Sequence, residues 1–365
     1  MGIRGIPANY GGFETFAEEL SGRMAAKGYK ISVYCRKGNS AHKDPYYKGV
    51  RLITLPTIKH KYFDTLAHTF LSVCRVIFTD TTIVYFCNPI NSIFLLLPRL
   101  FGKKVIINVD GLEWKRAKWN KIGKFGHRAC ERLAALFAHT VIADSKGIQE
   151  YYMQRFKRKT CYISYGAYKV EIKDDLKILE HYGLKQRGYF LYVSRLEPEN
   201  NAHIMINAYE KIKTEIPLII VGSAPYAKTY IRELHATKDK RIKFLGAVYN
   251  EGYHALVNNS FVYLHGNEVG GTNPALLQAM AAGNCVVVNG VSFNKEVISD
   301  TGVWFEPGNP MDLKTKLEHL LCNPQEITKY RALSAERIRN HYNWEKITLE
   351  YESLFMRMQN SCTDK

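Results

Sequence analysis

At 365 residues the chain is long enough for two domains, and its apolar fraction of 46% is normal for a protein with a sizeable core. Eight cysteines occur without a C-x-x-C pair, and no His-Glu-x-x-His sequence is present, so the composition predicts reduced thiols and neither a metal site nor a cofactor. The most apolar run, residues 90–101, is too short to span a bilayer and contains Pro98 and Arg99. We therefore expect a soluble or peripheral protein.

The net charge of +17 is unevenly distributed. Residues 1–166 contain 27 Lys and Arg against 11 Asp and Glu, whereas residues 167–365 contain 24 against 23. Nearly all of the excess lies in the first half. This asymmetry predicts a polyanionic partner for that half, such as an acidic membrane, a phosphate-bearing lipid or a nucleic acid. A basic surface that serves only solubility is the alternative.

Short β-branched runs alternate with longer amphipathic stretches along the first half. A helix is predicted from residue 13 to a C-cap at Gly28, and a second over 120–140. The predicted strands are 30–35, 50–55, 82–86, 104–109, 140–144 and 160–165. Strands separated by helices indicate an α/β fold with a doubly wound parallel sheet.

The second half repeats this scheme. Strands are predicted at 188–194, 217–222, 242–246, 261–266 and 285–290, and helices begin near Asn201, Tyr226, Tyr249 and Asn273. We place an N-terminal domain at 1–168, a linker at 169–188, a C-terminal domain at 189–343 and a last helix at 344–365, which is expected to return to the first domain. The first glycine loop has almost no strand before it. We therefore expect the first strand of that sheet to be missing, with the true start upstream.

Four motifs carry candidate chemistry, and each follows a predicted strand or opens a helix. The segment 2–20 is a glycine loop with Gly11 and Gly12 before a helix, which lets the backbone approach an anionic ligand. It lacks the G-x-G-x-x-G pattern of dinucleotide binding. The segment 108–119, NVDGLEWKRAKW, places Asp110 and Glu113 after a buried strand as candidate catalytic carboxylates. A turn cap and a solvated charged surface are the structural alternatives.

The other two motifs lie in the second half. In 194–201, SRLEPENN, Arg195 is suited to bidentate phosphate contact, and Gly222 follows the next strand. In 268–283, a glycine pair opens a helix whose free N–H groups favour an anion, although an ordinary capped helix would read the same. The donor-binding candidates of this last motif are Glu268, Gly270, Gly271, Thr272, Asn273 and Gln278.

Basic residues of the first half are interleaved with aromatic and aliphatic ones. Such a surface suits an acidic membrane and the phosphate of a lipid-linked acceptor. The candidates for this contact are Lys115, Arg116, Lys118, Lys121, Lys124, Arg128 and Arg132.

Together the four motifs resemble, in order and over most of the chain, bacterial rhamnosyltransferases of the retaining GT-B glycosyltransferases (family 4-like) that build capsular and cell-wall rhamnose polymers. The resemblance implies two Rossmann-like domains facing a cleft, with Gly11, Gly12 and Asp110 opposite Arg195 and 270–272. It implies a nucleotide-sugar donor, dTDP-rhamnose, and a lipid-linked saccharide acceptor at the inner face of the plasma membrane. Neither a metal nor nucleic acid is expected.

Two positions depart from the pattern of the resembled family. Its second ribose-binding glutamate is replaced by Gln278, and Gly270 stands eight residues before it, with Glu268 two residues early. The phosphate-binding lysine is replaced by Asn200. Together with the missing strand, these departures keep open a catalytically weak or inactive homologue that binds a nucleotide-sugar or nucleic acid. A sugar-nucleotide epimerase of the same two-domain fold is a further alternative.

Overall fold

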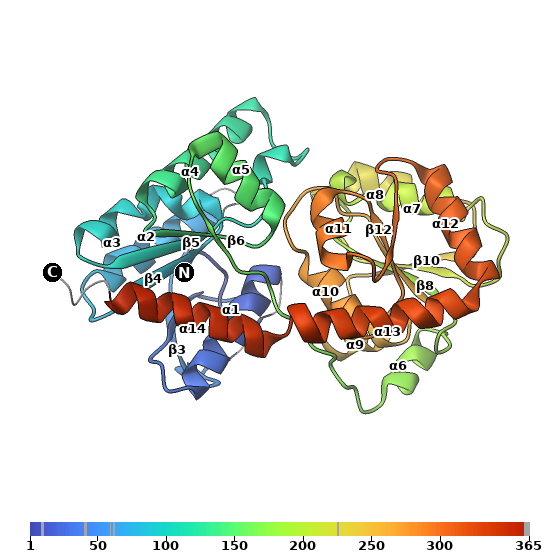
Figure 1. The fold of residues 1–365 in the computed structure, drawn as a ribbon, viewed down its shortest axis with the longest axis horizontal. Coiled ribbons are helices and arrows are strands. Elements are labelled where there is room, and N and C mark those ends of the chain that lie inside the picture. The colour runs from blue at the N-terminus through green and yellow to red at the C-terminus, as the bar shows by residue number, and fades with distance from the viewer. Residues whose placement is uncertain (9–10, 40–41, 59, 61–62, 225, 361–365) are drawn as a thin grey trace. The chain divides into compact units, whose positions relative to one another are not determined.

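The computed structural model describes residues 1–8, 11–39, 42–58, 60, 63–224 and 226–360, and the chain forms two compact units. Unit 1 comprises Met1–Tyr165 and Trp344–Lys365, and unit 2 comprises Gly166–Asn343 (Figure 1). Each unit is built around a parallel sheet with helices on both of its faces.

The strands of unit 1 pair in two groups. Its strands are β1 (Ser32–Arg36), β2 (Tyr46–Tyr47), β3 (Val50–Leu55), β4 (Ile83–Cys87), β5 (Lys104–Asn108), β6 (Thr140–Ala143) and β7 (Cys161–Tyr162). One group has the order β1-β3-β2 and the other β4-β5-β6-β7, and only β2 is antiparallel. Successive side chains of β1 point to opposite faces of the sheet. Tyr34 packs with α2 (Asp64–Val76) and α4 (Lys121–Phe137), whereas Val33 and Cys35 pack beside α1 (Gly12–Ala26).

Residues 1–4 occupy the place where the first strand was expected to be missing. The Met1 amino group donates to the Tyr85 carbonyl, the Cys87 N–H donates to the Met1 carbonyl, and the Arg36 N–H donates to the Arg4 carbonyl. The segment therefore bridges β4 and β1, although it is too short to form a regular strand. The position is therefore occupied, and with this segment in it the strands of unit 1 lie in the order β2, β3, β1, residues 1–4, β4, β5, β6, β7.

The remaining elements of unit 1 are helices. α14 (Trp344–Asn360) packs on α1 through an aromatic group in which the Phe16 and Tyr351 ring centroids lie 5.5 Å apart. Arg23 and Glu345 form an ion pair of 2.9 Å across the same contact. The others are η1 (Pro89–Phe94), α3 (Leu96–Leu100), η2 (Glu113–Lys115) and α5 (Lys146–Phe156).

Unit 2 has one six-stranded sheet with the order β10-β9-β8-β11-β12-β13, and all of its pairings are parallel. When the six strands are numbered by their order in the sequence, they lie side by side as 3-2-1-4-5-6, which is the Rossmann order. The strands are β8 (Phe190–Val193), β9 (Leu218–Val221), β10 (Ile242–Gly246), β11 (Val262–His265), β12 (Val286–Asn289) and β13 (Val303–Phe305). The chain reverses its direction of winding between β8 and β11, and open α/β sheets bind ligands at such a point.

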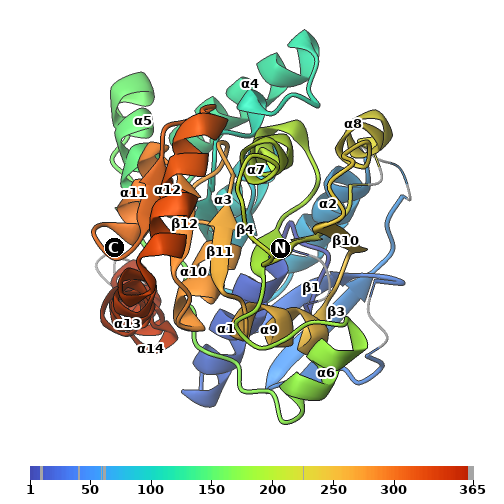
Figure 2. The ribbon, with the colours of Figure 1, turned by 90° about the vertical axis from the view of Figure 1, so that its right-hand side faces the viewer.

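Helices cover both faces of this sheet, as the two ribbon views agree (Figure 2). On one face lie α7 (Ala202–Tyr209), α8 (Lys228–Leu234) and α12 (Pro310–Cys322), which enclose the main apolar core with β8 and β9. On the other lie α9 (Asn250–Asn258), α10 (Pro274–Ala281) and α13 (Pro324–His341). α11 (Ser292–Ile298) follows β12.

The segment 169–188, which the sequence predicts to be a linker, belongs to unit 2. It contains α6 (Asp175–His181), which packs against α9, and Leu179 and Leu184 are buried. These two apolar side chains fix the segment to unit 2 because exposing them would leave apolar surface in water.

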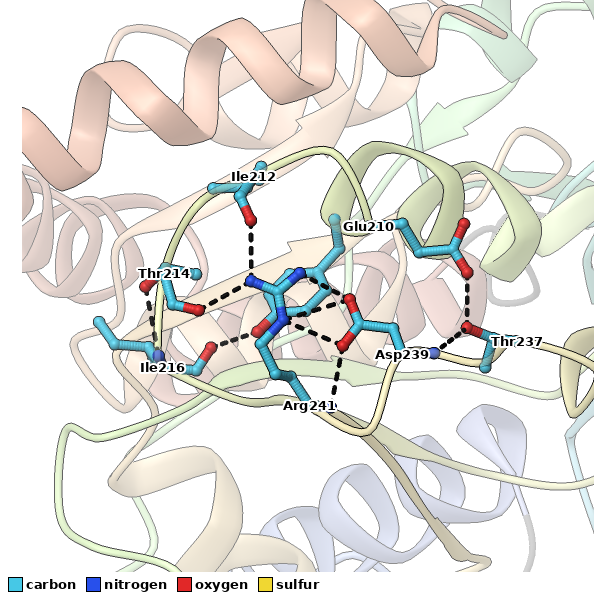
Figure 3. A network of polar contacts seen from close by, with 8 residues as sticks. Glu210, Ile212, Thr214, Ile216, Thr237, Asp239 and Arg241 are labelled. Carbon is cyan, nitrogen blue, oxygen red and sulfur yellow. Dashed lines mark hydrogen bonds and ion pairs between the residues drawn. The ribbon is translucent and has the colours of Figure 1, made fainter.

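A polar network closes the amino-terminal edge of the unit 2 sheet (Figure 3). Arg241, just before β10, donates to the carbonyls of Ile212 and Thr214 at 2.8 Å each and pairs with Asp239 at 2.6 Å. The network joins the two loops that precede β9 and β10. It lies at the edge opposite to the carboxyl ends of the strands, so we assign it a structural role.

Candidate functional site

The best-defined part of the site lies at the switch point of unit 2. Ser194 follows β8 and Asn267 follows β11, the two strands between which the winding reverses. The Ser194 hydroxyl donates to the Asn267 side-chain oxygen at 3.2 Å. The two strand ends are thus joined directly where a parallel sheet presents its ligand residues.

Asparagine amides hold the loop after β11 in one conformation. Asn201 donates to the Gly266 carbonyl at 2.9 Å, and Asn289 donates to the same oxygen at 3.1 Å. Asn294 donates to the Asn267 carbonyl at 2.9 Å. Because buried carbonyls need partners, these neutral amides stabilise a loop that no regular structure supports.

Arg195 and Gly222 follow two neighbouring strands, β8 and β9, as the sequence predicts for strand ends. The Arg195 side chain is 47% exposed and lies 3.6 Å from Glu197, so its guanidinium can turn to an anion without being uncovered. Gly222 has a φ of 142°, and a Cβ atom there would lie 1.8 Å from the Ser194 carbonyl oxygen. Only glycine fits at this close approach of two strand ends.

Asn200 does not substitute for the missing lysine. It is 1% exposed, and its amide donates to the Arg195 carbonyl at 2.7 Å. The side chain therefore braces the loop that carries Arg195 and is turned away from solvent.

The glycine turn before α10 has the expected capped helix. Asn273 accepts the Ala275 N–H at 2.9 Å and is the cap, while Gly271 and Thr272 are buried beside it. Glu268 is exposed, and one of its carboxylate oxygens accepts from the Asn201 amide at 3.1 Å.

Gln278 lies one turn into α10. Its amide nitrogen donates to the Tyr168 carbonyl at 3.0 Å, so a ribose hydroxyl would have to bond the remaining amide oxygen. His265, at the end of β11, is buried, and burial lowers its pKa to about 3, which keeps the ring neutral.

The glycine loop of unit 1 is held by two carboxylates of α1. Glu14 accepts the Arg4 N–H at 2.9 Å, and Glu18 accepts the Ala8 N–H at 2.6 Å. Gly11 is the residue before α1, and Gly12 is the first of the helix. Residues 9–10 of the predicted loop lie outside the described residues. The loop starts beside residues 1–4 and β4, at the switch point of the unit 1 sheet.

Asp110 and Glu113 follow β5 but differ in their surroundings. Glu113 pairs with Arg116 and with Lys118 at 2.7 Å each. Burial alone would raise the pKa of Glu113, but these two cations lower it to about 2. The ion pairs of Glu113 therefore hold the loop after β5 in place. Asp110 lies at the end of β5 and has a left-handed backbone conformation with a φ of 45°.

The basic candidates of unit 1 form two sets. Arg116 and Lys118 bond Glu113, and the guanidinium of Arg128 lies 4.0 Å from the Trp114 ring centroid. Lys121, Lys124 and Arg132 lie on α4. The exposed residues of α4 are Lys121, Ile122, Phe125, Gly126, Arg128, Ala129, Arg132 and Leu136.

Sequence reasoning missed several residues that shape these sites. Asp144 follows β6 directly and is buried, but it read only as the end of a strand. Asn267, Asn289 and Asn294 lie outside the four motifs, and Ser194 and Asn201 lie within 194–201 but were not singled out. Their positions just beyond strand ends were the one available signal.

A surface pocket of about 560 Å³ lies between α7 and α8 of unit 2, and the donor candidates named above do not line it. Within the described residues, no three His, Cys, Asp or Glu side chains gather as a metal site requires. No helix in the described part of the chain is both long and apolar enough to cross a bilayer.

Comparison with known proteins fits this geometry. Residues 176–341 match the family "Glycosyl transferases group 1", and residues 1–168 match "Domain of unknown function (DUF1972)". The first match lies within unit 2 and the second covers most of unit 1. An uncharacterized glycosyltransferase of Methanocaldococcus jannaschii is 24% identical over 96% of both chains.

More distant relatives match about half of the chain and half of their own length. An N-acetylgalactosaminyltransferase of Campylobacter jejuni that acts on a diphospho-undecaprenol saccharide is 29% identical over 46% of each chain. The D-rhamnosyltransferase WbpZ of Pseudomonas aeruginosa is 24% identical over 51% of this chain and 50% of its own.

Solved structures resemble the whole chain. HepE of Anabaena, in complex with UDP and glucose, has a TM-score of 0.79 at 17% identity and covers 97% of this chain and 98% of its own. Sucrose-phosphate synthase of Thermosynechococcus elongatus has a TM-score of 0.80 at 18% identity over 97% and 96%. The predicted GT-B fold with two Rossmann-like domains is thereby confirmed.

Proposed function

We propose that this glycosyltransferase transfers L-rhamnose from dTDP-rhamnose to a lipid-linked saccharide during the synthesis of a surface polysaccharide, with retention at the anomeric carbon. The observation that carries the proposal is the prepared switch point of unit 2, where Arg195, Gly222 and the loop after β11 meet. The undecaprenol-linked substrate named for the C. jejuni relative supports the acceptor class. WbpZ is named for D-rhamnose, the mirror image of the proposed sugar, and supports a 6-deoxyhexose only as the class of the transferred sugar.

The donor diphosphate is assigned to unit 2. Arg195 supplies a guanidinium for bidentate contact, and backbone N–H groups at the start of α10 supply further donors. When the bond from the anomeric carbon to the diphosphate breaks, negative charge grows on the leaving oxygen. These fixed donors stabilise that charge, which is the largest effect that such a site can offer. The nucleotide-sugar is thus a substrate, and the chemistry requires no metal.

Asp110 of unit 1 is assigned to the acceptor side. A carboxylate at the end of a buried strand can accept a hydrogen bond from a sugar hydroxyl and orient it. Glu113 holds the surrounding loop through Arg116 and Lys118, so its contribution is indirect.

We also propose that unit 1 docks on the anionic inner face of the plasma membrane. On α4 the exposed side chains of Ile122 and Phe125, at 81% and 75%, stand beside Lys121 and Arg132. Apolar groups that enter the headgroup region, flanked by cations that meet lipid phosphate, are typical of interfacial helices. The partner is accordingly an acidic lipid surface and not nucleic acid.

A non-catalytic nucleotide-sugar binder is the second candidate. The inward position of Asn200 favours it, because the site lacks the second cation for the diphosphate. The sugar-nucleotide epimerase alternative has no such support.

One assay separates these functions. The protein is incubated with bacterial membranes and radiolabelled dTDP-rhamnose, UDP-glucose or GDP-mannose, and label in the lipid fraction is measured. Incorporation from dTDP-rhamnose is expected, with the anomeric configuration of the donor retained in the product as measured by NMR. Donor binding without incorporation from any donor would support the non-catalytic reading, and labelling only from another donor would overturn the rhamnose assignment.

Membrane docking is tested with liposomes. Replacing Lys121, Lys124, Arg128 and Arg132 with Gln should weaken binding to acidic liposomes and leave nucleotide-sugar affinity unchanged. The matched control removes four exposed lysines of unit 2 instead, Lys213, Lys238, Lys240 and Lys243. Equal binding of the wild-type protein to neutral and acidic liposomes, or equal losses in both variants, would contradict the docking surface.

A further inference from the structure

Two aspartates stand side by side at the carboxyl edge of the unit 1 sheet. β5 and β6 are parallel neighbours, and Asn108 pairs with Ile142. The pairing continues one residue further, because the Val109 N–H donates to the Ile142 carbonyl at 3.1 Å. Asp110 and Asp144 are each two residues beyond the Asn108–Ile142 pair, so the register brings them opposite one another. A side-chain hydrogen bond with Asp144 is one of the effects that act on the pKa of Asp110.

The two carboxyl groups have different access to a substrate. Asp144 is 0% exposed and immediately precedes Ser145, the N-cap of α5. Asp110 is partly exposed and adopts a left-handed backbone conformation at the strand end, with a φ of 45°. A reacting sugar can therefore reach Asp110, but Asp144 can act only through it.

A buried amide fixes the backbone of Asp110. Asn108 is fully buried, and its side-chain oxygen accepts the Asp110 N–H at 2.9 Å. The nitrogen of the same amide is buried without a hydrogen-bond partner among the residues that the structure describes. An unsatisfied buried donor is costly, so this second observation marks the strand end as a place where a ligand acceptor would fit.

Charged and polar groups surround the pair. Arg116 and Glu113 act on Asp110 with opposite signs, and the buried Tyr165 lies near both aspartates. Cys87 interacts with Asp110, and Tyr351 interacts with Asp144. Burial raises the pKa of Asp110, while the hydrogen bond from Asp144 works against that rise. Two carboxylates joined by a hydrogen bond in such surroundings hold one proton between them.

We propose that Asp144 is a positioning residue that keeps this proton and donates it in a hydrogen bond to the carboxylate of Asp110. Asp110 then stays ionised and its carboxylate is held in one orientation toward the acceptor sugar. This inference rests on the proposed function, since it gives Asp110 its role in transfer.

The proposal is tested by comparing Asp144→Asn with Asp144→Ala. An asparagine amide can still donate to Asp110, so Asp144→Asn should rescue most of the kcat that Asp144→Ala loses, which we expect to be at least about 100-fold with the donor KM unchanged. The wild-type rate should fall at alkaline pH, when the pair loses its proton, and Asp144→Asn should lack that fall. Glu131→Gln, which alters another buried carboxyl of unit 1, should keep the wild-type pH profile.

A second measurement does not depend on turnover. In protein labelled with ¹³C at the aspartate carboxyls, one signal should remain protonated at pH 7, and it should vanish in Asp144→Asn. If no aspartate is protonated at pH 7, or if Asp144→Asn and Asp144→Ala lose activity equally while folded, the proposal is overturned. If the wild-type protein transfers no sugar but the protonated signal is present, the proposed function fails and the shared proton stands.

Discussion

The two units prepare the carboxyl ends of their strands by different means. In unit 2, neutral side chains such as Ser194, Asn201 and Asn289 bond one another and the backbone, and Arg195 adds an exposed cation. In unit 1, burial raises the pKa values of the carboxyls of Glu131 and of the partly exposed Asp110. The contrast shows two ways to prepare strand ends for a ligand. In unit 2, hydrogen bonds between neutral groups hold the loops in one conformation beside a cation, whereas unit 1 places carboxyl groups there whose protonation can change.

The largest expected effect tests whether the buried carboxyls of unit 1 make stability depend on pH. Glu131 is 2% exposed on α4 and accepts the Tyr151 hydroxyl at 2.7 Å. Burial raises its pKa from 4.5 to about 7. Between these values the native state binds more protons than the unfolded state, so stability falls as pH rises from 4.5 to 7.

Glu131→Gln should therefore raise the free energy of unfolding by about 3 kcal/mol at pH 8 and by almost nothing at pH 4. Urea unfolding of the wild-type protein and of Glu131→Gln between pH 4 and pH 8 measures the difference in the free energy of unfolding. The contributions of all other titrating groups are the same in both proteins and cancel in this difference. If the free energies of unfolding of the two proteins differed by the same amount at every pH, the pKa of Glu131 would not be raised. Glu131 would then no longer support the contrast between the two units.

This difference between the units also explains what a sequence can predict here. The runs of β-branched residues located β3 at 50–55 and β9 near 218–221, because buried parallel strands need continuous apolar side chains. They missed β13, whose three residues are too few for a pattern. The switch-point residues Arg195 and Gly222 were found because strand ends are visible in sequence.

What could not be predicted depends on register and orientation. The pairing of Asp110 with Asp144 follows from which β5 residue lies opposite which β6 residue, and the sequence does not specify that register. The inward turn of Asn200 and the pairing of Glu113 with Arg116 depend on side-chain packing in loops. Residues 1–4 lie between β1 and β4 and are held there by only a few hydrogen bonds. Four residues are too few to show the alternation of apolar side chains from which a strand is predicted.

The next effect concerns the exposed cation of unit 2. Arg195→Ala should weaken binding of a nucleoside diphosphate or nucleotide-sugar by about 1.5–3 kcal/mol, because a charge-assisted contact to the diphosphate is lost. Titration calorimetry with dTDP and with thymidine separates the phosphate contact from the base. The matched control is Arg232→Ala, which removes an exposed arginine from α8. Equal dTDP affinities for Arg195→Ala and the wild-type protein would exclude the role of Arg195.

The smallest expected effect asks whether the unit 2 site requires its neutral amides. The resembled family has a glutamate where this chain has Gln278, so Gln278→Glu would raise activity if the amide merely weakened ribose binding. The structure predicts otherwise, because the Gln278 amide nitrogen donates to the Tyr168 carbonyl. A carboxylate has no N–H to offer, and its oxygen would face the carbonyl oxygen. We expect Gln278→Glu to lower the free energy of unfolding by about 1–2 kcal/mol and to leave donor affinity no better than in the wild-type protein. Gln278→Ala, which removes the hydrogen bond without adding charge, separates the lost bond from the repulsion. Tighter donor binding in Gln278→Glu would mean that a charged group is tolerated there, and the view of unit 2 as a site shaped by neutral amides would have to be given up.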